Sequence, residues 1–214
     1  MLPSLVTMLD LLERSPLLGE LSVPGRFNHG GNFDPRKVAL PRLRSLWIAA
    51  EPPWGIPSFL HNLVLPVQTD IDICTDLELG ETFAHIVPAH NSLRFESLHG
   101  LRRLELVWDG REWSLLAYRE PADYHSPALQ IRATYPTSPG NEGPGARFFG
   151  EWPIETSQVE TFVVSGNWAI RGEEDVSIER RQWARMLHAL PGLKTLRWST
   201  HLRKSLKTSY ASSD

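Results

Sequence analysis

The stretch LHALPGLKTLRW, residues 187–198, joins the end of one structural element to the start of another. A helical run closes at Leu190, because Pro191 has no backbone N–H with which to continue it. The spacing L-x-x-L-x-W then follows, and its last apolar residues, Leu196 and Trp198, alternate with a polar residue as in a strand. The stretch therefore predicts a helix, a turn and a short strand, and it supplies a template to search for elsewhere.

Relatives of this template recur along the whole chain. With the second apolar position taken as the mark, the series is Leu21, Leu46, Ile71, Leu104, Leu129, Phe162 and Leu196. Successive marks are 25, 25, 33, 25, 33 and 34 residues apart. Repetition on this scale is typical of solenoids, in which each unit buries its apolar face against neighbouring units. We predict an α/β fold of about seven short parallel strands, stacked side by side and joined by helical or extended return segments.

The segments between the marks differ from one another. Apolar residues at helical spacing predict helices over residues 4–14, with Ser4 as the N-cap, over residues 57–63 and over residues 178–190. After Leu106 the pair Asp109-Gly110 lies between two apolar runs, which is a hairpin signal. We therefore expect an additional strand there instead of a helix. The repeats continue across both Gly/Pro-rich loops, residues 24–36 and 136–147, so we assign one solenoid to residues 1–200 and a basic, disordered tail to residues 201–214.

Composition limits the class of protein. The 214 residues are 41% hydrophobic and 22% charged, as in ordinary globular proteins, and the net charge of -3 is opposite to that of a general nucleic-acid binder. The single cysteine, Cys74, cannot form an internal disulfide. The N-terminus carries Asp10 and Glu13 and no basic leader, and no apolar run approaches the roughly 18 residues of a membrane span. We expect a cytoplasmic or nuclear protein that binds neither membrane nor nucleic acid.

Side chains that alternate with the inward apolar residues should form a row on the opposite side of the sheet. This row comprises Ser22, Trp47, Asp72, Glu105, Gln130, Val163 and Arg197, flanked by Asp70, Arg103, Arg132 and Thr195. In solenoids such a row lines the concave face, where protein partners bind. We name Trp47, Asp70, Asp72, Glu105, Arg132 and Arg197 as candidate protein-binding residues. The alternative is that Trp47 packs against a neighbouring loop and that the charges only keep the sheet soluble.

No catalytic or cofactor signature stands out. The run from Asp70 to Glu81 fits some positions of a calcium-loop template, but Thr75 replaces the required glycine and Cys74 is a poor ligand for calcium. Ile71 and Ile73 alternate with the aspartates as in a half-buried strand. His85 and His90 lie five residues apart without a second cysteine, as expected of surface histidines. Cys74 is best explained as a small buried side chain. We predict no enzyme activity, no cofactor and no bound metal.

The spaced leucines resemble irregular leucine-rich repeats, and more narrowly the repeat portion of F-box proteins from basidiomycete fungi. In that family a block W-x-x-x-L-x-x-L-P-x-L-x-x-L often comes last, and here it is formed by Trp183, Leu187, Leu190, Pro191, Leu193 and Leu196. The resemblance covers nearly the whole chain. It implies a target-recognition region of a ubiquitin ligase subunit. The alternative is a free-standing scaffold with no role in ubiquitin transfer.

The chain departs from that family at its N-terminus. The F-box itself, which binds the ligase adaptor, has no counterpart here, so adaptor binding is expected only if an F-box is encoded before Met1. Leu2, Leu5, Val6 and Leu9 suggest an apolar face with no preceding unit to cover it. Since terminal repeats need a polar cap, we expect this end to require a partner or to belong to a truncated product.

Overall fold

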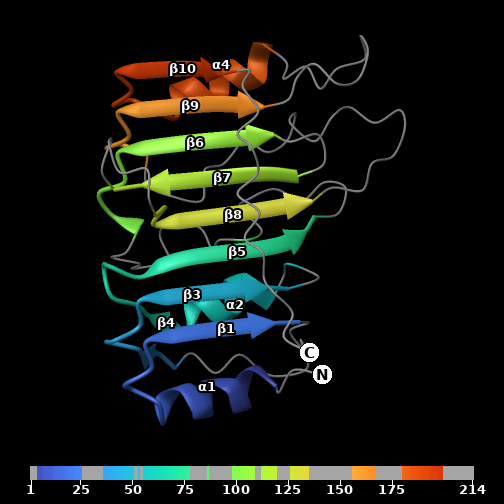
Figure 1. Ribbon diagram of the computed structural model, residues 1–214, viewed down its shortest axis with the longest axis vertical. Coiled ribbons are helices and arrows are strands. Elements are labelled where there is room, and N and C mark those ends of the chain that lie inside the picture. Colours follow the sequence, from blue (N-terminus) through green and yellow to red (C-terminus); the bar gives the residue numbers. More distant parts are fainter. Residues whose placement is uncertain are drawn as a thin grey trace, which may run out of the picture.

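The computed structural model describes residues 4–25, 36–50, 53, 55–77, 86, 98–108, 112–119, 126–134, 156–166 and 180–199, with the backbone alone for residues 180–182. These residues form one eight-stranded sheet, a two-stranded sheet and three helices (Figure 1). In spatial order the main sheet contains β1 (Glu20–Pro24), β3 (Ser45–Ala49), β5 (Asp70–Asp76), β8 (Leu129–Thr134), β7 (Glu112–Tyr118), β6 (Arg103–Trp108), β9 (Thr161–Gly166) and β10 (Thr195–Ser199). The fold is mixed α/β with a large, mostly parallel sheet.

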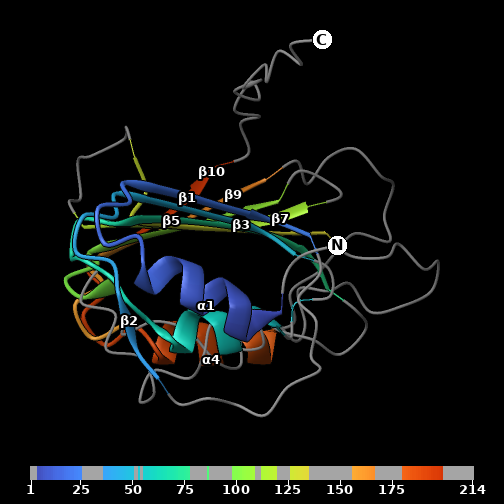
Figure 2. The ribbon, with the colours of Figure 1, turned by 90° about the horizontal axis from the view of Figure 1, so that it is seen from below.

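The helices α1 (Leu5–Glu13), α2 (Gly55–His61) and α4 (Arg180–His188) all lie on one side of the main sheet (Figure 2). The small sheet pairs β2 (Val38–Ala39) with β4 (Leu63–Val64) in parallel. The predicted cap is confirmed, because the backbone N–H of Thr7 donates to the Ser4 hydroxyl at 3.2 Å. Helix α2 begins two residues before the predicted start, and Pro57 fits its first turn because N–H groups there have no intrahelical acceptor.

The seven repeat marks lie in one register row. Leu21, Leu46, Ile71 and Leu129 are aligned across β1, β3, β5 and β8. Leu104, Phe162 and Leu196 are aligned across β6, β9 and β10, and Ala117 of β7 completes the row. Side chains of this row point toward the helices, and most are buried in a single core that extends from Met8 to Leu190. The predicted strands and their inward faces are confirmed.

The spatial order of the strands departs from their order in the chain. β1, β3 and β5 are sequential neighbours, but β8 and not β6 lies beside β5. The reason is the additional strand predicted after Leu106. β7 pairs antiparallel with both β6 and β8, so two hairpins carry the chain back toward β5. Trp108 and Trp113 face each other across the β6–β7 pair, with ring centroids 4.8 Å apart.

The pairs Leu40-Pro41 and Leu190-Pro191, which precede β3 and β10, begin the same kind of turn. The backbone N–H of Leu43 donates to the Leu40 carbonyl, and that of Leu193 donates to the Leu190 carbonyl, each at 3.1 Å. In both turns the proline is the second residue, a position that favours its fixed φ. The turns also pack on their neighbours, since a Cβ added to Gly192 would lie 2.7 Å from the carbonyl oxygen of Ser157.

Helix α1 packs at the β1 end of the main sheet. At the β1 end, α1 lies alongside the sheet on the helix-covered side (Figures 1 and 2). Met8, Leu9 and Leu12 of this helix are buried. The expectation that Leu9 belongs to an uncovered apolar face is therefore wrong, because the helix folds its apolar stripe against the core. Leu2 lies outside the described residues, as do the 24–36 loop except for Pro24, Gly25 and Arg36, the 136–147 loop and the 201–214 tail.

Candidate protein-binding face

The side of the main sheet opposite the helices carries the predicted outward row. We call it the helix-free face, because α1, α2 and α4 of the described chain all lie on the other side (Figure 2). In register order its central row is Ser22, Trp47, Asp72, Gln130, Leu116, Glu105, Val163 and Arg197. All seven predicted members are present. Leu116 was missed because it comes from the antiparallel strand, although alternation in the run EWSLLAY would have indicated it.

Four of the six candidate residues lie close together on β3, β5 and β8. Trp47 is the direct cross-strand neighbour of Asp72. Arg132 on β8 donates from Nη2 to Oδ2 of Asp72 at 2.9 Å. Asp70 lies two residues before Asp72 on the same side of β5, and all four side chains are partly exposed. We call Trp47, Asp70, Asp72 and Arg132 the β5 cluster. It exists because β8 lies beside β5.

The ion pair in the β5 cluster is partly desolvated. Burial raises the pKa of the Asp72 carboxyl above its usual value, and the charge of Arg132 and its hydrogen bond oppose this rise. Burial lowers the pKa of the Arg132 guanidinium, but the charge and hydrogen bond of Asp72, together with Cys74 and Glu112, offset it, so the net direction is upward. Asp72 Oδ1 and Arg132 Nε are each buried and have no hydrogen-bond partner among the described residues. A single hydrogen bond therefore joins Asp72 and Arg132, and each side chain still has a polar atom that could form another hydrogen bond.

Asp70 takes part in a second polar group at the start of β5. Its Oδ2 accepts a hydrogen bond from the Ser126 hydroxyl at 2.9 Å, and its Oδ1 lies 3.8 Å from Nη1 of Arg119. Arg119 also donates to the backbone carbonyl of Thr69 at 3.2 Å. These contacts tie Arg119, which follows β7, and Ser126, which precedes β8, to the start of β5, and they hold the Asp70 carboxylate in place at the edge of the cluster.

Glu105 lies apart from the β5 cluster and is not accessible. It is 2% exposed, and its Oε2 lies 3.0 Å from Nη2 of Arg103, which is buried as well. The Arg103 guanidinium also lies over the ring of Tyr118, 5.2 Å from the centroid. The prediction that Glu105 offers its charge to a partner is therefore wrong. The carboxylate is enclosed by a buried network that also includes Ser165, whose hydroxyl is 3.5 Å from Oε1 of Glu105.

Arg197 is exposed but distant from the cluster. It lies on β10, which is six strands from β3 in the sheet. At about 4.8 Å between strands, the backbones of Trp47 and Arg197 are roughly 29 Å apart. The sequence correctly placed both side chains on one face, but they belong to separate parts of it.

The other chemical candidates can be placed only in part. Asp70, Asp72 and Cys74 alternate with buried Ile71 and Ile73 along β5, so the predicted alternation is confirmed and the first part of the calcium template, as far as Asp76, is a regular strand. Cys74 is half-buried on the helix-free face, not fully buried as predicted. Burial raises the pKa of its thiol, partly offset by Arg132. Over the described ranges, no group of three or more His, Cys, Asp or Glu residues is arranged to hold a metal ion. His85 and His90 lie outside those ranges.

Two further findings bear on the class of protein. None of the helices in the described part of the chain combines the length and the apolar character needed to cross a membrane. The chain matches no family model, no curated protein and no solved structure, so the chemistry of the helix-free face is argued from its own residues.

Proposed function

We propose that the chain is a protein-interaction module that binds another protein through the β5 cluster. The observation that carries this proposal is the placement of Trp47 opposite Asp72, whose carboxylate pairs with the guanidinium of Arg132, on the helix-free face. Tryptophan and arginine are the residue types most enriched at the energetic centres of protein interfaces. A partner that covers Trp47 would also desolvate the ion pair beside it.

The charge pattern of the cluster favours a protein over a polyanion as ligand. Two carboxylates, Asp70 and Asp72, lie near two guanidinium groups, Arg119 and Arg132. Nucleic-acid surfaces present excess positive charge to neutralise phosphates. A patch with both signs instead suits a protein surface of complementary pattern, which fixes orientation and excludes wrong partners. No catalytic role is proposed.

The finer assignment is a leucine-rich-repeat solenoid that recognises the target of an F-box-type ubiquitin ligase in the cytoplasm or nucleus. The common register of the seven marks and the recurrent Leu-Pro turn support the repeat assignment. The reversed order of β6, β7 and β8 departs from regular repeats, which follow chain order, and this departure applies equally to the alternative, a free-standing leucine-rich-repeat scaffold. An in-frame F-box helical segment encoded before Met1 would support the ligase assignment, and its absence there would support the scaffold.

The experiment compares the proteins that immobilised wild type and variants of this chain retain from a lysate. Wild-type protein, the double variant Trp47→Ala with Asp70→Ala, and the control Leu11→Ala are immobilised and exposed to lysate of the encoding organism. We expect that wild type and control retain a protein that the double variant does not retain. That protein is then purified and titrated against all three, and the double variant should bind it more weakly. Equal retention by all three would contradict the proposal. A large fall in melting temperature of the double variant would instead show that these side chains belong to the core.

A further inference from the structure

The surroundings of Trp47 on the helix-free face are acidic. Its direct cross-strand neighbours are Ser22 on β1 and Asp72 on β5, and Glu20 and Asp70 occupy diagonal positions on the same two strands. At about 4.8 Å between strands and about 3.3 Å per residue along them, the diagonal backbones lie roughly 8 Å from that of Trp47. None of the three strands contains a lysine, arginine or histidine. Three carboxylates and no cation of these strands therefore surround the indole.

The nearby arginines leave this charge in place around Trp47. Arg119 and Arg132 come from the end of β7 and from β8, and each already faces one aspartate of β5. Arg42 and Arg44 are exposed in the turn before β3, and within the described chain neither guanidinium lies over the Trp47 ring. Glu20 is exposed, and among the described residues its carboxylate has no ion pair or hydrogen bond. The side of Trp47 toward β1 thus carries an unpaired negative charge.

The sequence next to these elements is acidic as well. The segments that follow β1, β3, β5 and Arg119 are residues 26–35, 51–54, 78–85 and 120–125. Their acidic residues are Asp34, Glu51, Glu78, Glu81, Glu120 and Asp123. They contain one arginine, Arg26, and no lysine. Whatever the arrangement of these segments, acidic residues outnumber basic ones in the chain that adjoins this area.

Trp47 also differs from the other tryptophans in having no aromatic neighbour. Trp108 and Trp113 pair with ring centroids 4.8 Å apart, and Trp183 and Trp198 pair at 5.3 Å. Within the described part of the chain Trp47 has neither a ring contact nor a hydrogen bond, and its side chain is partly exposed. An indole attracts cations through its quadrupole, and the adjacent carboxylates attract the same cation through their charge.

We propose that the partner bound at the β5 cluster presents a basic segment there, and that an arginine of this segment stacks on Trp47 within reach of Glu20 and Asp70. This inference rests on the proposed function and names the chemistry of the partner. Arginine fits this position better than lysine, because a planar guanidinium stacks on an aromatic face while its N–H groups donate in the plane to carboxylates. An acidic segment would instead meet like charge on β1 and β5.

The first test measures the preference for arginine with the full chain. A blocked, fluorescently labelled peptide of alternating arginine and glycine is titrated against the protein, alongside peptides with lysine or glutamate in place of arginine. We expect saturable binding of the arginine peptide, weaker binding of the lysine peptide and none of the glutamate peptide. Trp47→Leu should weaken arginine-peptide binding about two- to fivefold and remove the preference over lysine, whereas Trp47→Phe should retain part of it. Equal affinity of wild type for the arginine and lysine peptides, or an unchanged preference in Trp47→Leu, would overturn the proposal.

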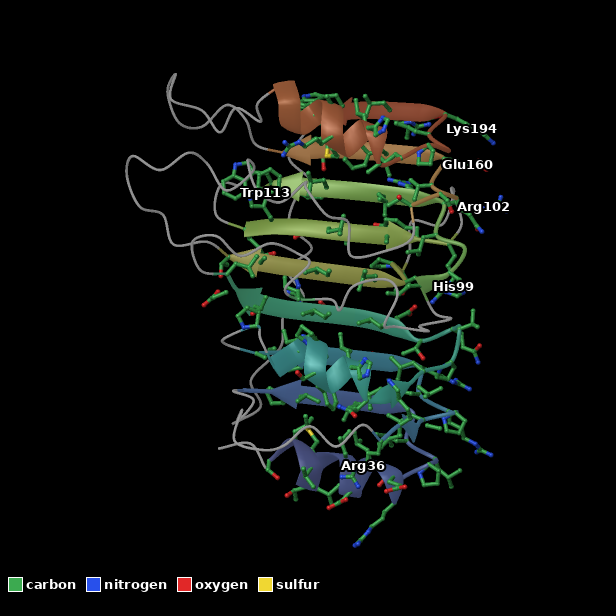
Figure 3. All side chains as sticks on the ribbon, turned by 180° about the vertical axis from the view of Figure 1, so that it is seen from behind. Arg36, His99, Arg102, Trp113, Glu160 and Lys194 are labelled. Carbon is green, nitrogen blue, oxygen red and sulfur yellow. The ribbon has the colours of Figure 1, made fainter. Side chains whose placement is uncertain are left out.

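The second test locates the negative charge. Glu20→Gln removes a carboxylate next to Trp47, and the control Glu160→Gln removes one at the far end of the sheet, where Figure 3 shows Glu160 near Lys194, its partner at 3.1 Å. We expect Glu20→Gln to weaken both basic peptides about twofold, with a larger effect at low salt. Glu160→Gln should leave both affinities unchanged. Equal effects of the two variants would show general attraction to an acidic protein and overturn the site.

The third test separates this inference from the proposed function. The arginine peptide, in excess, should displace the protein that the chain retains from lysate through Trp47. A retained protein that depends on Trp47 but resists the peptide would overturn the basic segment and leave the proposed function standing. Absence of any protein that depends on Trp47 would overturn the proposed function itself. A peptide of residues 201–214 that binds more tightly than the arginine peptide, and requires Trp47, would assign the surface to the chain's own basic tail and overturn a separate partner.

Discussion

The two ends of the sheet use similar apolar patterns and reach different burial. At the β1 end, α1 packs Leu9 into the core, where it is 1% exposed. At the β10 end, Leu196 occupies the same register row as the buried Leu46 but remains half exposed. The repeat motif therefore determines to which side of the sheet a side chain points, and the neighbouring element determines how much of that side chain is buried. In a stack of units, burial at an end depends on whether a capping element is present.

The largest expected effect is at the capped end. Leu9→Ala should lower the free energy of unfolding by about 2–5 kcal/mol, because it removes a buried side chain and leaves a cavity. Leu196→Ala, at the β10 end, should cost no more than about 1 kcal/mol, since half of that side chain is already hydrated. Denaturant unfolding of both variants measures the difference. Equal losses would contradict the contrast between the ends.

A pair of glycines tests how tightly the turns pack at each end. Gly192→Ala would place a Cβ 2.7 Å from the Ser157 carbonyl oxygen, and the nearest such contact at Gly19 is 4.0 Å, from Arg42. We expect Gly192→Ala to destabilise the protein by about 1–3 kcal/mol through overpacking. Gly19→Ala, the matched control near β1, should change the melting temperature little. A similar small shift for both would show that the turn before β10 is loosely packed.

The cap of α1 should contribute less. Ser4→Ala removes the acceptor for the Thr7 N–H and should cost about 1 kcal/mol. Ser4→Thr retains a hydroxyl acceptor and should recover most of this loss in the same unfolding experiment. If alanine and threonine have equal effects, the hydroxyl does not stabilise the helix and α1 is held by packing alone.

The smallest effect is expected between the ends, at Asp72. Its pKa is raised in the folded protein, so the folded state binds a proton more tightly than the unfolded state does. The stability contributed by this group is therefore greatest below about 3.9, the usual aspartate pKa, and is lost as pH rises through the raised value. Wild type should gain stability relative to Asp72→Asn as pH falls through that window. A difference that is constant with pH, or that falls in acid, would contradict the desolvation of the pair.

Much of the fold could be predicted from spacing, but the strand order could not. The steps from Leu46 to Ile71 and from Leu104 to Leu129 are both 25 residues long. The first contains α2 and joins adjacent parallel strands, whereas the second contains β7 and joins strands with an antiparallel strand between them. The hairpin signal at Asp109-Gly110 marked the second connection. Where the returning strand would pair depends on contacts between distant segments, which no local pattern specifies.

The candidate site was predictable to the same extent. Alternation along each strand placed Trp47, Asp72 and Arg132 on one face, and the register confirms this. The Asp72–Arg132 ion pair depends on β8 lying next to β5, so it could not be read from chain order. The burial of Glu105 depends on Arg103 and Tyr118, which come together only in the folded sheet.

Site-specific photo-crosslinking tests the central claim, protein binding at the β5 cluster, most directly. A photoreactive phenylalanine analogue replaces Trp47 in one variant and Leu11, which is 56% exposed on α1, in another. After irradiation in lysate of the encoding organism, adducts are resolved by mass. We predict a discrete adduct from position 47 that position 11 does not give. Identical adducts from both positions, or an adduct from position 11 alone, would contradict the claim.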